Sequence, residues 1–336
     1  MSRKRMMDLV AGVMAAKTIY AAAELQLPDL LAEGRRATTE LAEQSGVHGP
    51  SLRRLLRALV TLDVVAEAGS DCYELTEFGM LLRSDTPDSM RALVRARCGP
   101  EYWKSWGELD AAVRTGKPGW ELAHGMSWIE FYQQHRSRWS DFNTHMRQHT
   151  KDAAPGILAG YDFSGLHTLV DLGGGDGALL IEILRAYADL RGVLFDLPAV
   201  VGSAPATLVA AGVWERCEVV GGNFFEGVPA GADAYLMKFI LHDWDDDQAA
   251  AIPRRCREAM TSNGRVLIVE RVMPDHPTPA DIDPVLYDIL MLVLTGGKER
   301  TEADYRGLLE SAGLTLKSVT PPLPPFQYRV IEGVPT

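Results

Sequence analysis

One stretch of this 336-residue chain, residues 169–177 (LVDLGGGDG), constrains the fold more than any other feature. An apolar, strand-like run leads into it, and a helical run at residues 178–187 follows it. Glycines let the backbone approach a ligand closely, and the N-terminus of the following helix offers free N–H groups. About twenty residues further on, Asp196 ends a second apolar run, where nucleotide-binding folds place the acid that accepts ribose hydroxyls. The stretch therefore predicts a nucleotide-binding turn.

After residue 160 the chain alternates strand-like and helical runs, which predicts an α/β domain with a parallel sheet and helices on both faces. Ligands of such sheets bind at the carboxyl ends of the strands. The strand-like runs are residues 168–172, 193–196, 217–220, 234–238, 266–270 and 315–319, with a last strand at 327–332. The helical runs are residues 178–187, 199–211, 248–260 and 301–311, and a buried helix is expected at 286–294.

The first hundred residues indicate a small, mostly helical domain. Residues 7–32 have apolar positions at helical spacing. Residues 39–62 read as helix-turn-helix, and residues 64–75 as the two strands of a wing. The next segment holds five of the seven tryptophans; helix packing explains most of these rings, and some should wall an apolar pocket. We therefore expect a winged-helix domain at residues 1–98, a helical aromatic linker at 99–155 and a Rossmann-like domain at 156–336.

Charge argues against a nucleic-acid partner. Residues 1–150 hold 19 basic and 19 acidic residues, so the remaining 34−19=15 basic and 45−19=26 acidic residues carry the entire net charge of −11. We saw no apolar run of the roughly 18 residues that a membrane span needs. The four cysteines lie far apart in sequence and are expected to be buried thiols. These features favour a cytoplasmic protein without a membrane partner.

His242 is the candidate base, because it follows the fourth strand at the expected ligand-binding edge. Histidine is a natural general base, because its unperturbed pKa of about 6.5 lies near neutral pH. Position alone leaves a structural role equally open. His145 and His149 lie one helical turn apart, but no third ligand at suitable spacing accompanies them, so we expect no metal site.

The glycine turn alone fits NAD as well as S-adenosylmethionine. Further along the chain come GGNFF at residues 221–225, HDW at 242–244 and GGKERT at 296–301. With these motifs in this order, the chain resembles the metal-independent, plant-type O-methyltransferase family over nearly its full length. HDW and GGKERT are the specific signals. The resemblance implies a Rossmann-like class I methyltransferase domain behind a winged-helix dimerisation domain, hence a homodimer. It also implies S-adenosyl-L-methionine as methyl donor, with S-adenosyl-L-homocysteine as product, and no metal.

The family also implies residue roles. His242 would be the general base, with Glu270 and Glu299 orienting its imidazole and stabilising the imidazolium. Asn223 stands where relatives usually have Asp, which predicts somewhat weaker cofactor binding, although its carbonyl can still accept from adenine. The implied cofactor-binding residues are Gly173, Gly175, Asp196, Asn223, Phe224, Lys238, Met146, His149 and Thr150. The implied acceptor-binding residues are Trp128, Tyr132, Phe142, Met146, Asp243, Trp244, Leu290, Met291 and Leu294.

The apolar character of Leu290 and Leu294 favours a flat aromatic acceptor held by stacking and contact area. We therefore expect O-methylation of a small phenolic acceptor, in secondary-metabolite biosynthesis. A relative that keeps the cofactor pocket but has changed its chemistry to N- or C-methylation or hydroxylation is one alternative. Two other classes of protein also compete with this interpretation. A winged-helix DNA-binding regulator would use Arg53, Arg54 and Arg57 on the second helix of its motif. An NAD-dependent dehydrogenase would explain the glycine turn but neither HDW nor GGKERT.

Overall fold

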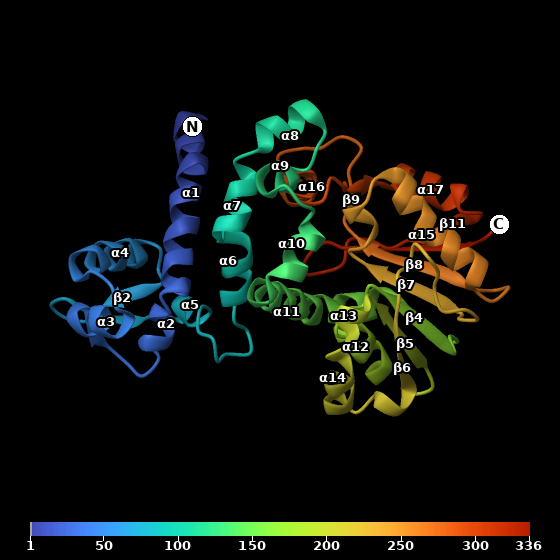
Figure 1. Cartoon of the computed structure of the whole chain (residues 1–336), viewed down its shortest axis with the longest axis horizontal. Coiled ribbons are helices and arrows are strands. Elements are labelled where there is room, and N and C mark those ends of the chain that lie inside the picture. The colour runs from blue at the N-terminus through green and yellow to red at the C-terminus, as the bar shows by residue number, and fades with distance from the viewer. Residues whose placement is uncertain (1) are drawn as a thin grey trace. The chain divides into compact units, whose positions relative to one another are not determined.

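The computed structural model describes residues 2–336, except for the side chains of Ser2, Arg136 and Ser137. The chain forms two compact units. The first comprises residues 1–104 and 132–145, and the second comprises residues 105–131 and 146–336. The aromatic segment at 99–155 is thus divided between the units. Figure 1 labels the elements.

The first unit contains the helix-turn-helix and wing that the sequence predicts. In α4 the apolar side chains of Leu52, Leu56 and Leu59 recur at helical spacing and are buried. Arg53 on the same helix donates two hydrogen bonds to Asp71 at the wing turn, the Nε contact measuring 2.8 Å, so this guanidinium is already engaged. The elements are α1 (Ser2–Glu24), α2 (Leu27–Leu30), β1 (Arg36–Ala37), α3 (Thr38–Ser45), α4 (Gly49–Thr61), β2 (Val65–Glu67), β3 (Cys72–Leu75), α5 (Glu77–Met80), α6 (Arg91–Cys98) and α7 (Pro100–Trp106). The three strands form an antiparallel sheet in the order β1-β3-β2.

Helix α1 differs from the expectation that no segment is apolar enough to span a membrane. Among the described residues, Arg3–Glu24 is the one helix that is long and apolar enough by length and composition. Such a helix is weak evidence for a span, because apolar helices that pack against protein pass the same test. Met6, Val10 and Met14 on α1 are more than half exposed, and α1 lies beside α6 (Figure 1).

The second unit is built on a seven-stranded sheet in the order β11-β12-β8-β7-β4-β5-β6. All its strands run parallel except β12, which pairs antiparallel with both neighbours. The sheet is therefore mixed rather than wholly parallel, because β11 and β12 are joined by a short connection without a crossover helix. The strands are β4 (Thr168–Leu172), β5 (Arg191–Asp196), β6 (Cys217–Gly221), β7 (Ala234–Lys238), β8 (Arg265–Glu270), β11 (Leu314–Val319) and β12 (Arg329–Pro335).

Helices cover both faces of this sheet (Figure 1). Side chains of β7 and β8 alternate between two apolar clusters, one packed against α11, α12 and α14 and the other against α15 and α17. The helices are α8 (Leu109–Thr115), α9 (Gly119–His124), α10 (Trp128–Gln134), α11 (Arg136–Gly160), α12 (Ala178–Ala186), α13 (Pro198–Val201), α14 (Ala204–Ala211), η1 (Trp214–Arg216), η2 (Leu241–Asp243), α15 (Asp246–Ala259), α16 (Ile282–Leu294) and α17 (Glu302–Ser311). A short parallel pair joins β9 (Val272–Met273) to β10 (Arg300–Thr301).

Two expectations about burial need correction. Helix α16 is buried on one side only, since Leu290, Met291 and Leu294 face the interior while Leu286 is 54% exposed. An amphipathic helix presents its apolar stripe to the core and the rest of its surface to solvent. All four cysteines are free thiols, but only Cys217 and Cys256 are buried. Cys72 and Cys98 in the smaller first unit are partly exposed.

Candidate active site

The glycine turn lies between β4 and α12, as the sequence predicts. Gly173 and Gly175 both adopt positive φ angles, 67° and 63°, which residues with a side chain rarely adopt. The N–H of Gly175 donates to Asp196 Oδ2 at 2.9 Å, and the N–H of Leu197 donates to Oδ1 at 2.7 Å. Burial raises the pKa of Asp196 while these two hydrogen bonds oppose the rise. Each carboxylate oxygen still has a free lone pair, so Asp196 can also accept from ligand hydroxyls.

Asp171, which the sequence interpretation did not single out, lies directly beneath this turn. Its carboxyl is 2% exposed, and a Cβ added to Gly174 would lie 2.5 Å from Oδ2. No donor among the described residues forms a hydrogen bond with Oδ2. Burial raises the pKa of Asp171 to about 7, and the ammonium of Lys238 opposes this. A buried acceptor without a donor is costly, so the base of the turn suits a ligand that brings a donor or positive charge. An acid inside an otherwise apolar strand was the available signal.

Asn223 and Phe224 form the loop after β6. The Asn223 carboxamide closes a local turn, because Oδ1 accepts from the N–H of Phe225 at 3.0 Å and Nδ2 donates to Glu226. The Phe225 ring packs edge-on against Trp244, with centroids 4.7 Å apart, and Phe224 packs against both rings. Trp244, expected at the acceptor, thus lies beside the loop expected to bind adenine.

Helix α11 carries Met146, His149 and Thr150. His149 Nε2 forms a 2.6 Å hydrogen bond with the Tyr328 hydroxyl, and its ring stacks on Phe326 with centroids 4.3 Å apart. The structure therefore places His149 against the start of β12 and the loop before it. Thr150 is buried and Met146 is half-buried.

A further residue of α11, Arg147, forms an ion pair with Asp176 of the glycine turn. This ion pair connects the helix directly to the turn. The sequence interpretation did not select Arg147.

His242 is almost fully buried in η2, the short helix after β7. Its Nδ1 lies 2.9 Å from Glu299 Oε1, and its Nε2 lies 3.8 Å from Asp243 Oδ1. Burial alone lowers the imidazole pKa, but the carboxylates of Glu299 and Asp243 outweigh this effect and raise the pKa of His242 to about 9. The carboxylate at Nδ1 fixes a proton there and leaves Nε2 as the nitrogen that can accept another.

Glu270 forms hydrogen bonds to the main chain of the turn, and its negative charge also raises the pKa of the His242 imidazole. Its Oε1 accepts the backbone N–H groups of Ile240, Leu241 and His242 at 3.1, 2.7 and 3.2 Å. Its Oε2 accepts a short hydrogen bond from the Tyr305 hydroxyl. Glu270 is fully buried at the end of β8, so three converging N–H groups replace the hydration that its carboxylate has lost. Its contacts fix the backbone of the turn that carries His242.

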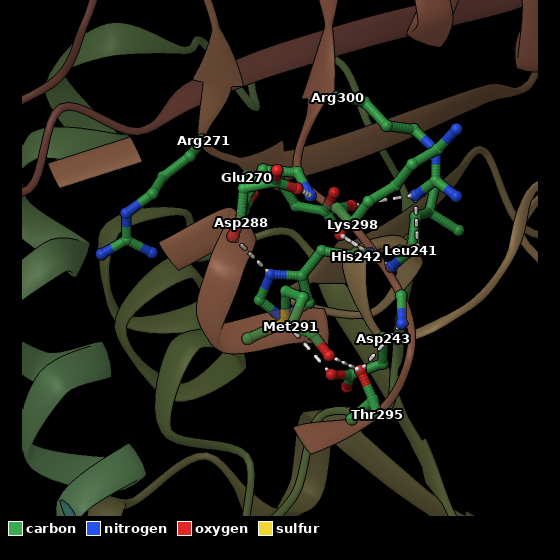
Figure 2. Close-up of polar contacts among 12 residues, drawn as sticks. Leu241, His242, Asp243, Glu270, Arg271, Asp288, Met291, Thr295, Lys298 and Arg300 are labelled. Carbon is green, nitrogen blue, oxygen red and sulfur yellow. Dashed lines mark hydrogen bonds and ion pairs between the residues drawn. The ribbon is translucent and has the colours of Figure 1, made fainter. Parts of the chain in front are cut away.

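The GGKERT segment holds the same turn from the carbonyl side (Figure 2). The buried Arg300 guanidinium donates to the carbonyl oxygens of Leu241 and Trp244 at 2.7 and 2.8 Å. A Cβ on Gly297 would overlap the backbone at His242, so only glycine allows this approach. The backbone N–H of Glu299 donates to Asp288 of α16 at 3.0 Å. The motif therefore contacts both the imidazole and the main chain that carries it.

Phe239 begins this turn in a left-handed conformation, with φ of 59°, which is strained for a bulky residue. Its ring stacks on the His242 imidazole, with centroids 5.2 Å and planes 15° apart. The Lys238 ammonium lies 4.0 Å from the centroid of the same ring. Burial lowers the pKa of Lys238 to about 7. Phe239 thus connects the residue expected at the cofactor with the candidate base, and no sequence signal indicated this.

The predicted acceptor residues fall in both units. In the second unit, Asp243 lies beside the His242 Nε2 atom, and burial raises the pKa of its carboxyl to about 6. Leu290, Met291 and Leu294 are buried on α16, and Trp128 is half-buried. In the first unit, the rings of Tyr132 and Phe142 lie 5.6 Å apart. Among the described residues, no group of three or more His, Cys, Asp or Glu side chains could hold a metal ion.

The seven-stranded sheet, with a glycine turn hydrogen-bonded to an acid at the end of the next strand, fits the Rossmann-like class I methyltransferase fold. Comparisons with known proteins agree. Residues 106–315 match the O-methyltransferase domain family, and residues 7–85 match the O-methyltransferase dimerisation domain. The chain belongs to the plant-type O-methyltransferase family and is an O-methyltransferase.

Its relatives include bacterial enzymes of natural-product biosynthesis. The mitomycin biosynthesis 6-O-methyltransferase of Streptomyces lavendulae is 38% identical, over 94% of this chain and 89% of that protein. The phenazine O-methyltransferase of Lysobacter antibioticus is 37% identical, over 94% of this chain and 92% of that protein. A solved O-methyltransferase from neocarzinostatin biosynthesis, in complex with S-adenosyl-L-homocysteine and 1,4-dihydroxy-2-naphthoic acid, is 35% identical. Its TM-score is 0.84, over 96% of both chains.

Proposed function

We propose that this protein transfers the methyl group of S-adenosyl-L-methionine to a hydroxyl of a small aromatic acceptor in secondary-metabolite biosynthesis, with His242 as the general base. The observation that carries the proposal is the buried His242–Glu299 pair at the edge of the sheet. The names of the relatives support the acceptor class, since one is a 6-O-methyltransferase of mitomycin biosynthesis and another is a phenazine O-methyltransferase. The solved neighbour holds 1,4-dihydroxy-2-naphthoic acid.

The residues around the glycine turn fit this cofactor, which supplies an electrophilic methyl group on a positively charged sulfur. The partnerless oxygen of Asp171 offers a buried acceptor and negative charge beneath the turn. A Cβ at Gly175 would meet nothing within 4 Å, so its backbone is open to the methionine and ribose portions, whereas Gly173 packs against the Ile240 side chain. Gly173 stays a predicted cofactor contact, and Asp196 retains lone pairs for ribose hydroxyls. Lys238 lies beside these groups at the end of β7. Asn223 and Phe224 would meet the adenine, and α11 would close over it with Met146, His149 and Thr150.

His242 has the geometry of a base for a phenol. Glu299 holds the Nδ1 proton, so Nε2 can accept the phenolic proton, and the same carboxylate stabilises the imidazolium that forms. Phenols have a pKa near 10, and the pKa of His242 is about 9. Proton transfer between groups of nearly equal pKa is nearly balanced in free energy, so the phenolate becomes accessible without a strong base.

The acceptor would lie against α16. Leu290, Met291 and Leu294 provide buried apolar surface there, and Asp243 adds a carboxylate beside Nε2. A mostly apolar wall with a single acid suits a flat ring that presents one hydroxyl to the base. Trp128, Met146 and Trp244 in the same unit, and Tyr132 and Phe142 in the first unit, stay predicted acceptor contacts.

We also propose a homodimer formed through residues 1–98. The match of residues 7–85 to a dimerisation domain supports it. The exposed Met6, Val10 and Met14 on α1 give that domain an apolar surface of the kind that a second copy covers.

The decisive experiment incubates the protein with isotope-labelled S-adenosyl-L-methionine and a panel of natural phenols, each beside its arylamine analogue, with products identified by mass. We expect label on the phenols, and labelling of the amines alone would contradict O-methylation. The His242→Ala variant should lower kcat by about 10²- to 10⁴-fold, the usual contribution of a general base. Its affinity for S-adenosyl-L-homocysteine, measured by calorimetry, should stay unchanged. Full activity of the variant would remove His242 from the mechanism.

A further inference from the structure

We propose that Tyr305 is a positioning residue for the candidate base, acting through Glu270 on the turn that carries His242. The inference rests on the proposed role of His242. Tyr305 lies on α17, is fully buried, and donates a short hydrogen bond to Glu270 Oε2. Its hydroxyl also lies 3.4 Å from the carbonyl oxygen of Arg271. Tyr305 follows the family motif in sequence but is no part of it.

The two oxygens of Glu270 have separate partners. Oε1 accepts three backbone N–H groups from residues 240–242, while Tyr305 supplies the hydrogen bond to Oε2. If the tyrosine hydroxyl is removed, Oε2 becomes a buried carboxylate oxygen without that donor, which is costly. The carboxylate then has to rotate toward another donor. That rotation weakens the three bonds that hold the turn.

Tyr305 and Glu299 belong to one continuous segment. Glu299 fixes the imidazole ring, and six residues later Tyr305 fixes Glu270 and hence the backbone beneath that ring. Between them, a capping box formed by Thr301 and Asp304 starts α17, so the spacing of the two side chains is rigid. One segment, residues 299–305, therefore holds both the imidazole ring and the main chain of His242. A displacement of about 1 Å at a reacting group can cost about 10²-fold in rate.

The test is the Tyr305→Phe variant, which removes the hydroxyl and keeps the ring. We expect kcat per S-adenosyl-L-homocysteine-binding site to fall by about 10-fold, while KM for the acceptor changes less than about 3-fold. The pH at which the rate profile bends should stay unchanged, because Glu299 still faces the imidazole. Simple loss of folded protein would lower the number of binding sites and leave kcat per site as it was.

The matched control is Tyr235→Phe. Tyr235 is equally buried, lies on β7 of the same sheet, and its hydroxyl donates a 2.6 Å hydrogen bond to the carbonyl oxygen of Pro229, a residue outside the turn. This variant should retain kcat within about 2-fold. If Tyr305→Phe keeps wild-type kcat per site, or loses no more than Tyr235→Phe, the positioning role is wrong.

Glu270→Gln provides an independent check should Tyr305→Phe fold poorly. Alone it should lower kcat, and combined with Tyr305→Phe it should lower kcat much less than the product of the two single effects, because the pair acts as one unit. Fully multiplicative effects would overturn the proposal. Hydrogen exchange at residues 240–242 should quicken in Glu270→Gln and stay unchanged in Tyr235→Phe. Failure of His242→Ala to lose activity would contradict the proposed function itself, and that outcome is separate from these.

Discussion

Glu299→Gln isolates the charge beside the candidate base. The carboxamide oxygen can still accept from Nδ1 of His242, so the ring keeps its orientation and loses only the neighbouring negative charge. That charge is the main reason why the pKa of His242 is about 9 despite burial, which by itself lowers the imidazole pKa. The substitution should therefore lower the pKa of the base.

The size of the change follows from the contact. The bonded atoms lie 2.9 Å apart and both side chains are buried. Opposite unit charges with centres about 4 Å apart interact by about 4 kcal/mol at an effective dielectric constant of about 20. One pKa unit corresponds to about 1.4 kcal/mol, so the expected drop is roughly two to three pH units. Neutral imidazole would then predominate near neutral pH, but as a weaker base.

The assay is the pH dependence of kcat/KM for the acceptor at saturating cofactor. This profile reports the pKa of the base before the acceptor binds. For the wild type the rate should rise with pH and level off near 9, because the protonated imidazole cannot accept a proton. In Glu299→Gln the bend should move to roughly neutral pH, with a plateau lower by about 10-fold. Glu258→Gln, at an exposed glutamate of α15, is the control and should leave the profile unchanged. A bend that stays near 9 in Glu299→Gln would refute the assignment of Glu299.

Two further predictions concern the cofactor and the assembly. Asn223→Asp should tighten S-adenosyl-L-homocysteine binding by about 3- to 10-fold in calorimetry, because a carboxylate accepts stronger hydrogen bonds than an amide. The carboxylate can still close the turn at Phe225. Equal or weaker binding would show that this side chain does not meet the adenine. Light scattering should give about twice the 36.9 kDa chain mass. Val10→Glu, on the exposed face of α1, should halve the measured mass. A wild-type monomer would contradict the proposed dimer.

The elements that sequence could predict are those whose signals are local. The strands at 168–172 and 234–238 were predicted to the residue, because each is a short apolar run ended by glycine or a charged residue. The direction of β12 was not predicted, since it depends on the path of the loop before it. The winged helix was predicted because the apolar spacing of α4 and the turn on each side of it are local features.

The sequence predicts which residues gather at the site better than it predicts which atoms they contact. His242 and Glu299 were selected through the motifs that contain them, and they are in contact. The family resemblance implied Glu270 at the end of the fifth strand. Its hydrogen bonds go to the main chain, because burial at the end of β8 brings it beside the N–H groups of the turn. The partners of Glu270 lie 28 to 35 residues away in sequence. The sheet and α17 bring them together, so no local sequence pattern predicts these contacts. Tyr305 lies outside every motif of the family, so the sequence does not predict its role.

The glycine turn and the turn that carries His242 pack against each other. A Cβ at Gly173 would overlap Ile240, and the N–H of Ile240 is one of the three that Glu270 accepts. A side chain at position 173 would therefore have to displace the end of the Ile240 side chain, which belongs to the turn that carries His242. Because β4 and β7 are adjacent parallel strands, their carboxyl ends bring these two turns together. The glycine predicted to bind the nucleotide is thus also the residue that leaves room for the Ile240 side chain of the turn that carries His242.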